Sequence, residues 1–191
     1  MMLLSEATNV MNGRFFGKDS QFTSVGTDSR SITKGQLFVA LKGENFDGHD
    51  YAAQALQQGA AAVLISNSKS SLAPAIVVED TYLALGALAS YWREKFSIPV
   101  VAVTGSNGKT TVKEMITSIL SVKANSEHAI HATSGNLNNH IGLPLTLLKL
   151  RTTHQFSVLE MGMNHLGEID YLTHIAKPTV AAINNAGSAH I

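Results

Sequence analysis

The chain has 191 residues, 45% of them hydrophobic, which is enough to build one large domain or two small ones with proper cores. Its 14 basic and 14 acidic side chains cancel, so no overall field attracts nucleic acid or an anionic membrane. Cysteine is absent and no apolar run approaches the length of a membrane span, which excludes disulfides, thiolate metal sites and a membrane-spanning chain. With no basic leader before Glu6, we expect a globular cytoplasmic protein.

Residues 1–80 are predicted to form a small α/β domain. Its predicted elements are a helix over 3–13 that Ser5 could cap, a strand over 36–41, a helix over 52–58, and strands over 60–65 and 75–78. Residues 14–28 are weakly patterned, and residues 67–74 are typical of a polar turn. The order strand, helix, strand, turn, strand is characteristic of an α/β unit.

Two polar segments of this domain are candidate ligand sites. Residues 27–30, TDSR, set small oxygen-bearing side chains beside a guanidinium, which suits a phosphate or a base. An Asx turn with a solvated Arg30 explains the same residues. Residues 42–51 form a glycine-bearing polar loop directly after a buried strand, where α/β proteins usually place ligands, although His49 alone is typical of an ordinary surface residue.

Residues 81–96 are predicted to form a helix that bridges two domains, with Asp80 as its N-cap. Trp92 on this helix is more typical of a packing anchor than of a ligand platform.

The segment from Pro99 to Val112 predicts a nucleoside-triphosphate site. An apolar run over 100–103 is typical of a parallel strand, and apolar residues recur at helical spacing from Lys109 onward. The turn between them has glycines that let N–H groups face an anion, a mobile lysine, and a threonine hydroxyl suited to the Mg²⁺ of a nucleotide. The predicted nucleotide-binding residues are Gly105, Ser106, Asn107, Gly108, Lys109, Thr110 and Thr111.

This loop is a shortened form of the general pattern, because Val103 stands where the first glycine is usual. A glycine turn that binds nothing is the alternative. The unbroken run of strand, turn, Lys-Thr-Thr and helix favours the nucleotide site.

Clustered asparagines follow a predicted strand over 129–132. Asn136, Asn138 and Asn139 offer amide donors and acceptors just before a predicted helix over 141–150. Asparagine also suits plain turns, so both interpretations stay open.

Glu160 is a candidate Mg²⁺ ligand, because it ends a predicted strand over 155–159 at the sheet edge that also carries the phosphate loop. A helix over 166–175 and a strand over 179–183 follow. His190 comes after that strand and is a further candidate ligand.

Six motifs together resemble the Mur ligase family, in its order and over nearly the whole chain: TDSR at 27–30, FVALKGENFDGHDY at 38–51, AVTGSNGKTTVKEM at 102–115, TSGNLNNHIGLPLTLL at 133–148, EMGMNHLGEIDYL at 160–172 and NNAGSAH at 184–190. The resemblance implies an α/β chain with three parts. A small amino-terminal α/β domain (1–80) would bind the UDP-sugar, an interdomain helix (81–97) would follow, and a truncated P-loop-type parallel-sheet domain (98–191) would bind ATP.

The resemblance also assigns roles to single residues. Lys109, Glu160 and His190 would be catalytic, and Thr110, Glu160 and His190 would hold metal. The implied substrate-binding residues are Ser29, Arg30, Lys42, Gly43, Asp47, Gly48, His49, Thr133, Asn136, Asn138 and Asn139.

The resemblance further implies a ligase that joins D-alanyl-D-alanine to UDP-N-acetylmuramoyl-tripeptide, with ATP and Mg²⁺, through an acyl phosphate, in peptidoglycan precursor synthesis. We therefore expect such a ligase, monomeric and without nucleic-acid partners. Because the family continues beyond the His190 motif, we expect no ligase turnover from these 191 residues alone. The alternatives are a sister ligase that adds the third peptide residue, a noncatalytic nucleotide-binding module, and a generic phosphate-loop NTPase.

Overall fold

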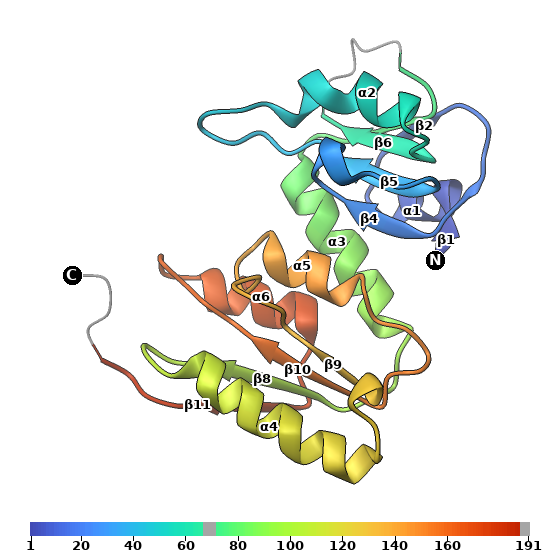
Figure 1. Ribbon diagram of the computed structural model, residues 1–191. Coiled ribbons are helices and arrows are strands. Elements are labelled where there is room, and N and C mark those ends of the chain that lie inside the picture. Colours follow the sequence, from blue (N-terminus) through green and yellow to red (C-terminus); the bar gives the residue numbers. More distant parts are fainter. Residues whose placement is uncertain (67–71, 188–191) are drawn as a thin grey trace. The chain divides into compact units, whose positions relative to one another are not determined.

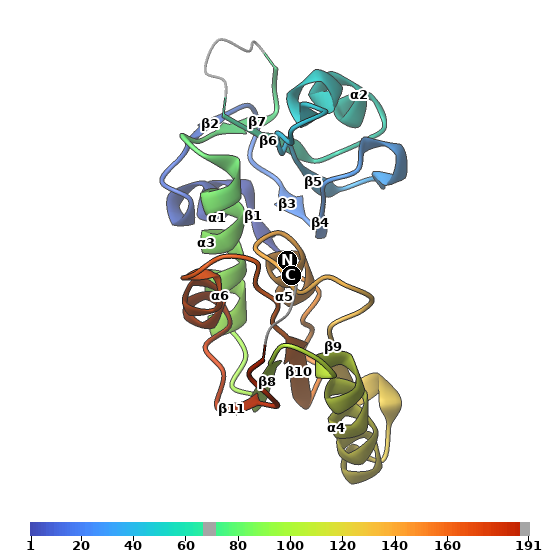
Figure 2. The same cartoon turned by 90° about the vertical axis from the view of Figure 1, so that its left-hand side faces the viewer.

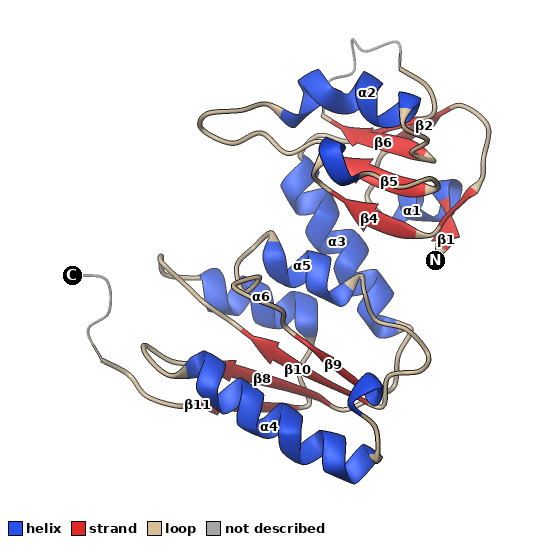
Figure 3. Ribbon diagram, viewed as in Figure 1, coloured by secondary structure: helices blue, strands red, loops and turns tan. Residues whose placement is uncertain are grey.

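The chain folds into two units, Met1–Leu88 and Ala89–Ile191, and their boundary falls inside helix α3 (Thr81–Glu94) (Figure 1). The computed structural model describes residues 1–66 and 72–187, so part of the predicted 67–74 turn, and His190, lie outside the described residues. Each unit combines helices with strands that are mostly parallel to their neighbours (Figure 3), which confirms the predicted α/β class. No helix in the described ranges is long and apolar enough to cross a membrane.

The first unit is built on a five-stranded sheet in the order β2-β7-β6-β5-β4. β4 to β7 are parallel to their neighbours, whereas β2 runs antiparallel to β7. The strands are β2 (Arg14–Phe16), β4 (Ser24–Gly26), β5 (Gln36–Val39), β6 (Ala62–Ile65) and β7 (Ala75–Val77). The three strands predicted before residue 80 are confirmed, with slightly shorter ends.

Helices cover this sheet on both sides. Figure 2 shows α2 (Ala52–Gln57) on one face and α1 (Leu4–Val10) on the other. Ala52 and Ala55 of α2 are fully buried against Phe38 and Val63 of the sheet. Small alanines let the helix approach the apolar strands closely, so the unit has a core of its own. Two short 3-10 helices, η1 (Ser29–Ser31) and η2 (Gly48–Tyr51), lie at the ends of loops.

The first 28 residues hold more structure than their pattern predicts. They contain β2, β4 and a two-stranded antiparallel pair of β1 (Met2–Leu3) with β3 (Gln21–Phe22). Strands of two or three residues are too short to show an alternating pattern. The predicted cap of α1 is wrong: the Ser5 hydroxyl donates to Asp19 at 2.6 Å, and Leu3 occupies the N-cap position.

Helix α3 is capped as predicted, because the Asp80 carboxylate accepts from the N–H groups of Tyr82 (2.7 Å) and Leu83 (3.0 Å). Trp92 is buried and donates from Nε1 to the Leu150 carbonyl at 3.2 Å. Its role as a packing anchor of the second unit is confirmed.

The second unit has a four-stranded, fully parallel sheet in the order β11-β8-β10-β9. Its strands are β8 (Val100–Thr104), β9 (Ile130–Ala132), β10 (Phe156–Glu160) and β11 (Val180–Ile183). Figures 1 and 2 show α4 (Lys109–Ala124) on one face and α5 (Gly142–Leu147) and α6 (Glu168–Ala176) on the other. The short 3-10 helix η3 (Glu127–Ala129) precedes β9. All the strands and helices predicted for this unit are confirmed.

In helix α4, the buried face differs in part from the apolar face that the sequence predicts. Met115 and Ile119 are 60% and 68% exposed, and the buried residue of this helix is Lys113. The spacing of apolar residues therefore predicts the helix correctly and only part of its packed face, because Val112, Ile116 and Leu120 are half-buried.

Candidate functional site

Topology brings the phosphate loop and Glu160 to one edge of the second sheet. β8 and β10 are neighbours, and Glu160 lies opposite Val103 in their parallel register. After β8 the chain crosses to β9 on one side, and after β10 it crosses to β11 on the other. In open parallel sheets such a reversal of direction opens a crevice at the carboxyl ends of the strands, where ligands bind.

The phosphate loop follows β8 directly and starts α4. Gly105 and Gly108 have φ of +144° and +75°, values that side-chain-bearing residues rarely adopt. A Cβ at Gly105 would lie 3.0 Å from the backbone of Asn185, so close approach also requires glycine there. Lys109 folds its ammonium back over the loop and donates to the carbonyls of Gly105 (2.8 Å) and Ser106 (3.3 Å).

The segment after β11 is hydrogen-bonded to this loop. The N–H groups of Ser106 and Asn107 donate to the backbone carbonyl and side-chain oxygen of Asn185 (3.2 and 3.0 Å). Asn184 donates from its side chain to the Asn107 carbonyl at 2.7 Å. The Ser106 hydroxyl bonds to Gly187. Two of the amides predicted to face an anion are thus already bonded to Asn185 in this structure.

Glu160 is the centre of a second group of contacts. Its side chain is buried, with 3% exposure of the residue, yet one carboxylate oxygen accepts from the Thr110 hydroxyl (2.8 Å) and the other from the Asn138 amide (2.8 Å). Its backbone N–H donates to the Thr133 hydroxyl at 3.0 Å. This group joins four segments of the chain, and the sequence analysis predicts a site role for each of its members: Thr110, Thr133, Asn138 and Glu160.

This group fits a hard divalent cation. Among the described residues, both partners of the buried Glu160 carboxylate are neutral, so its charge is not balanced by a cationic side chain. The Glu160 carboxylate and the Thr110 hydroxyl supply oxygen ligands of the kind that Mg²⁺ prefers, whereas Asn138 turns its amide NH₂ toward the carboxylate as a hydrogen-bond donor. Within the described ranges no three His, Cys, Asp or Glu residues gather into a metal cluster. Glu160 with Thr110 therefore forms the candidate metal position.

A cavity of about 610 Å³ opens beside Lys109. The phosphate loop forms one wall, and apolar side chains of Met163, Leu166 and Ile169 form much of the other. Glu168 orders this second wall, because its carboxylate accepts from the N–H groups of Asn164 and His165. The same bonds hold the pKa of Glu168 below its usual value.

The three candidate asparagines differ in their positions. Asn138 reaches Glu160, whereas the Asn139 side-chain oxygen accepts from Ile141 (3.1 Å) and Gly142 (2.8 Å) at the start of α5. Asn136 is exposed on the loop. The turn-forming interpretation therefore describes Asn139, and the site interpretation describes Asn138.

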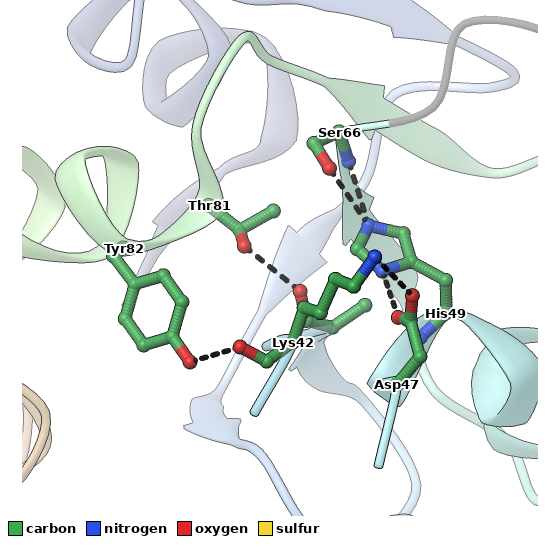
Figure 4. A network of polar contacts seen from close by, with 7 residues as sticks. Lys42, Asp47, His49, Ser66, Thr81 and Tyr82 are labelled. Carbon is green, nitrogen blue, oxygen red and sulfur yellow. Dashed lines mark hydrogen bonds and ion pairs between the residues drawn. The ribbon is translucent and has the colours of Figure 1, made fainter. Parts of the chain in front are cut away.

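In the first unit, the predicted 42–51 loop is tied to β6 by a polar network (Figure 4). Asp47 accepts from the backbone N–H of His49 (3.0 Å) and from its ring Nδ1 (2.5 Å), and Lys42 lies 3.8 Å from the same carboxylate. On the other side of the ring, Nε2 accepts from the Ser66 N–H at 3.0 Å. The bonds from His49 keep the pKa of Asp47 below its usual range.

Close packing and helix α3 complete the placement of this loop. A Cβ on Gly48 would lie 2.7 Å from the Leu41 carbonyl oxygen, so only glycine fits there. Tyr82 of α3 donates to the Lys42 carbonyl at 2.6 Å (Figure 4). These contacts fix one loop, which carries the candidate residues Lys42, Gly43, Asp47, Gly48 and His49. Ser66 and Tyr82 were not predicted, because isolated residues next to a strand or in a helix carry no local signal.

The TDSR segment adopts the Asx turn given as its alternative. The Asp28 carboxylate accepts from the backbone N–H of Arg30 (3.0 Å) and from its guanidinium (2.7 and 2.9 Å). The guanidinium bonds hold the pKa of Asp28 at about 2. Ser29 is buried, and the Arg30 side chain is exposed, which leaves its remaining donors facing solvent.

Comparison with known proteins agrees with this architecture. Residues 21–93 match the Mur ligase family, catalytic domain, and residues 103–191 match the Mur ligase middle domain. The chain belongs to the Mur ligase family. The Mur ligase resemblance of its sequence motifs is thereby confirmed.

Two Mur ligases from the curated proteins illustrate the relationship. The chain is 46% identical over 188 residues to the UDP-N-acetylmuramoyl-tripeptide–D-alanyl-D-alanine ligase of Escherichia coli K12, and 46% identical over 171 residues to that of Bacillus subtilis 168. These matches cover 98% and 87% of this chain but 41% and 36% of the relatives. The chain therefore spans about 41% of the length of the E. coli relative.

Solved Mur ligase structures have the same fold. MurF from Acinetobacter baumannii aligns with a TM-score of 0.88 and 42% identity, covering 97% of this chain and 41% of that chain. MurF from Thermotoga maritima, solved in complex with ADP, aligns with a TM-score of 0.80 and 38% identity, covering 87% and 38%.

Proposed function

We propose that this chain provides the UDP-sugar-binding and ATP-binding parts of a ligase that joins D-alanyl-D-alanine to UDP-N-acetylmuramoyl-tripeptide in peptidoglycan precursor synthesis. The observation that carries the proposal is the juxtaposition of Lys109, Thr110 and the buried Glu160 at one sheet edge. The names of relatives with 46% identity support the choice of substrates.

The proposed reaction has two steps. A carboxylate oxygen of the tripeptide attacks the γ-phosphorus of ATP, the bond to ADP breaks, and an acyl phosphate forms. The amine of D-alanyl-D-alanine then attacks the acyl carbon, and the tetrahedral intermediate expels phosphate as the peptide bond forms. The first step brings two anions together, so the protein must offset their repulsion.

The residues of the second unit match that need. Lys109 would turn its ammonium from the loop carbonyls to the β and γ phosphates, and the N-terminus of α4 adds the positive end of a helix dipole. Thr110 and Glu160, with Asn138 beside them, would hold Mg²⁺, and His190 is a further candidate. When bound, Mg²⁺ neutralises charge on the transferred phosphoryl group.

The first unit would hold the UDP-sugar. Arg30 supplies an exposed guanidinium for a phosphate, and the network around Asp47 and His49 presents the 42–49 loop as a preformed surface. Thr133, Asn136, Asn138 and Asn139 are the candidates for the muramoyl-peptide side.

Titration calorimetry with ADP and Mg²⁺ tests the nucleotide site. Lys109→Ala is expected to abolish measurable binding, because it removes the side-chain cation of the phosphate loop. Lys123→Ala, an exposed lysine in the last turn of the same helix, is the matched control and should bind as the wild type does. Unchanged affinity in Lys109→Ala would remove the site.

A second titration tests the substrate class. The chain should bind UDP-N-acetylmuramoyl-tripeptide more tightly than the corresponding dipeptide. Preference for the dipeptide would favour the sister ligase that adds the third residue, and ADP binding without any UDP-sugar binding would favour a noncatalytic nucleotide module.

A further inference from the structure

Lys113 is a buried cation without a role in the proposed nucleotide chemistry. It lies one helical turn after Lys109, is 3% exposed, and is the buried residue of α4. Removing an ammonium from water is costly unless good partners replace the solvent. A leucine at this position would fill the space without that cost, so the charge calls for a specific explanation.

The partners of Lys113 lead directly to the candidate metal position. Its Nζ donates to the backbone carbonyl of Thr133 at 2.8 Å and forms an ion pair with Glu114 at 2.6 Å. The hydroxyl of the same Thr133 accepts from the Glu160 N–H at 3.0 Å. Lys113 thus binds the backbone of Thr133, and the side chain of Thr133 binds the backbone of Glu160.

This chain of contacts closes a ring. Thr110 lies on the same helix as Lys113 and donates to the Glu160 carboxylate. Helix α4 therefore reaches Glu160 by two routes, directly from its first turn and indirectly from its second turn through Thr133. Two attachments on successive turns fix both the position and the rotation of the helix relative to the end of β10.

The Asn138 loop is part of the same arrangement. Thr133 follows β9 and begins the segment that carries Asn138, whose amide donates to the second oxygen of Glu160. An anchor at the start of this loop limits where Asn138 can lie. The ring thus sets the spacing of all three groups at the carboxylate.

We propose that Lys113 is a positioning residue that holds Thr110, Asn138 and Glu160 in register for the Mg²⁺ that accompanies the nucleotide. This inference rests on the proposed function, because it presumes that the site takes a metal–nucleotide complex. Lys113 acts through Thr133 and does not itself contact the phosphates. Partners of this kind around metal ligands typically change metal affinity 10- to 100-fold when they are removed.

Calorimetry with ADP tests the proposal, with each protein titrated once in Mg²⁺ and once in EDTA. Lys113→Met is expected to lose about 10- to 100-fold of the affinity measured in Mg²⁺ and to keep the affinity measured in EDTA. Lys113→Arg, which keeps a cationic donor, should restore part of the loss. Lys123→Met makes the same change at an exposed position of α4 and should behave as the wild type.

The two conditions separate positioning from simple destabilisation. A merely structural role for Lys113 predicts equal losses in Mg²⁺ and in EDTA, and that result would overturn the proposal. If wild-type protein shows Mg²⁺-dependent binding and Lys113→Met retains it, the positioning role fails while the proposed function stands. If wild-type protein binds no ADP in either condition, the proposed function and this inference fail together.

Thr133→Val supplies an independent variant if Lys113→Met does not fold. It removes the hydroxyl that accepts from Glu160 and keeps the size and branching of the side chain. The same selective loss in Mg²⁺ is expected, whereas full retention of the Mg²⁺ effect would overturn the relay through Thr133.

Discussion

His131 in β9 is a buried titratable side chain whose proton positions the structure defines. Its Nε2 lies 2.8 Å from the Thr146 carbonyl, which can only accept, so Nε2 carries the proton and Nδ1 accepts from the Ser157 hydroxyl at 2.9 Å. Burial lowers the pKa of His131 to about 4, and the ring of His154 lies 5.2 Å away. The folded protein therefore needs this imidazole neutral.

This neutral histidine predicts acid sensitivity of the second unit. Below the unfolded pKa of about 6.5 the unfolded chain binds a proton that the folded chain refuses until about pH 4, so the free energy of unfolding falls as pH falls through this window. The full effect is about 3 kcal/mol. Urea denaturation between pH 7 and 4 measures it, with His131→Gln as the comparison. A variant whose stability fell as steeply as the wild type would contradict this assignment.

At the scale of elements, Asn139 has a structural task that its sequence context does not reveal. Its side-chain oxygen accepts from two N–H groups at the start of α5, which would otherwise lack intrahelical partners. Helix α5 packs Leu143 and Leu147 into the core, and both residues are fully buried.

Asn139→Ala is expected to lower the free energy of unfolding by about 1 kcal/mol, the usual cost of losing a side chain that accepts from the free N–H groups at a helix start. Chemical denaturation measures this loss. Titration with UDP-N-acetylmuramoyl-tripeptide then separates capping from ligand contact: a cap alone leaves the affinity unchanged, and a large loss of affinity with normal stability would favour a direct contact.

For the whole molecule, the division into two units with separate sheets predicts separable stabilities. Leu64→Ala truncates a fully buried side chain of the first unit and should cost that unit about 2–5 kcal/mol. Hydrogen exchange should accelerate in residues of the first sheet, while ADP affinity in the second unit stays unchanged. Loss of ADP binding in Leu64→Ala would contradict this separation.

The sequence predicts best the features that lie in one continuous stretch. Strand, glycine turn, Lys109, Thr110 and helix follow one another, and Glu160 ends an apolar run, so both could be placed at a sheet edge from local pattern alone. The parallel register that sets Glu160 opposite Val103 then joins them.

Local sequence patterns could not predict the contacts between residues that lie far apart in the chain. Asn185 reaches the loop amides from 78 positions away, and Ser66 reaches His49 across 17. The burial of Lys113 likewise depends on the carbonyl of Thr133, which no helical periodicity reveals. A short strand such as β3 owes its existence to its partner β1, not to its own two residues.

Figure 4 shows Asp47, His49 and Ser66 in the order of a hydrolytic triad, but here the ring nitrogen that faces Ser66 also accepts a backbone hydrogen bond. The Ser66 backbone N–H donates to Nε2, so the imidazole proton sits on Nδ1 facing Asp47, and the Ser66 hydroxyl lies 3.0 Å from the same Nε2. The histidine consequently links the loop to the end of β6 through hydrogen bonds at both of its ring nitrogens.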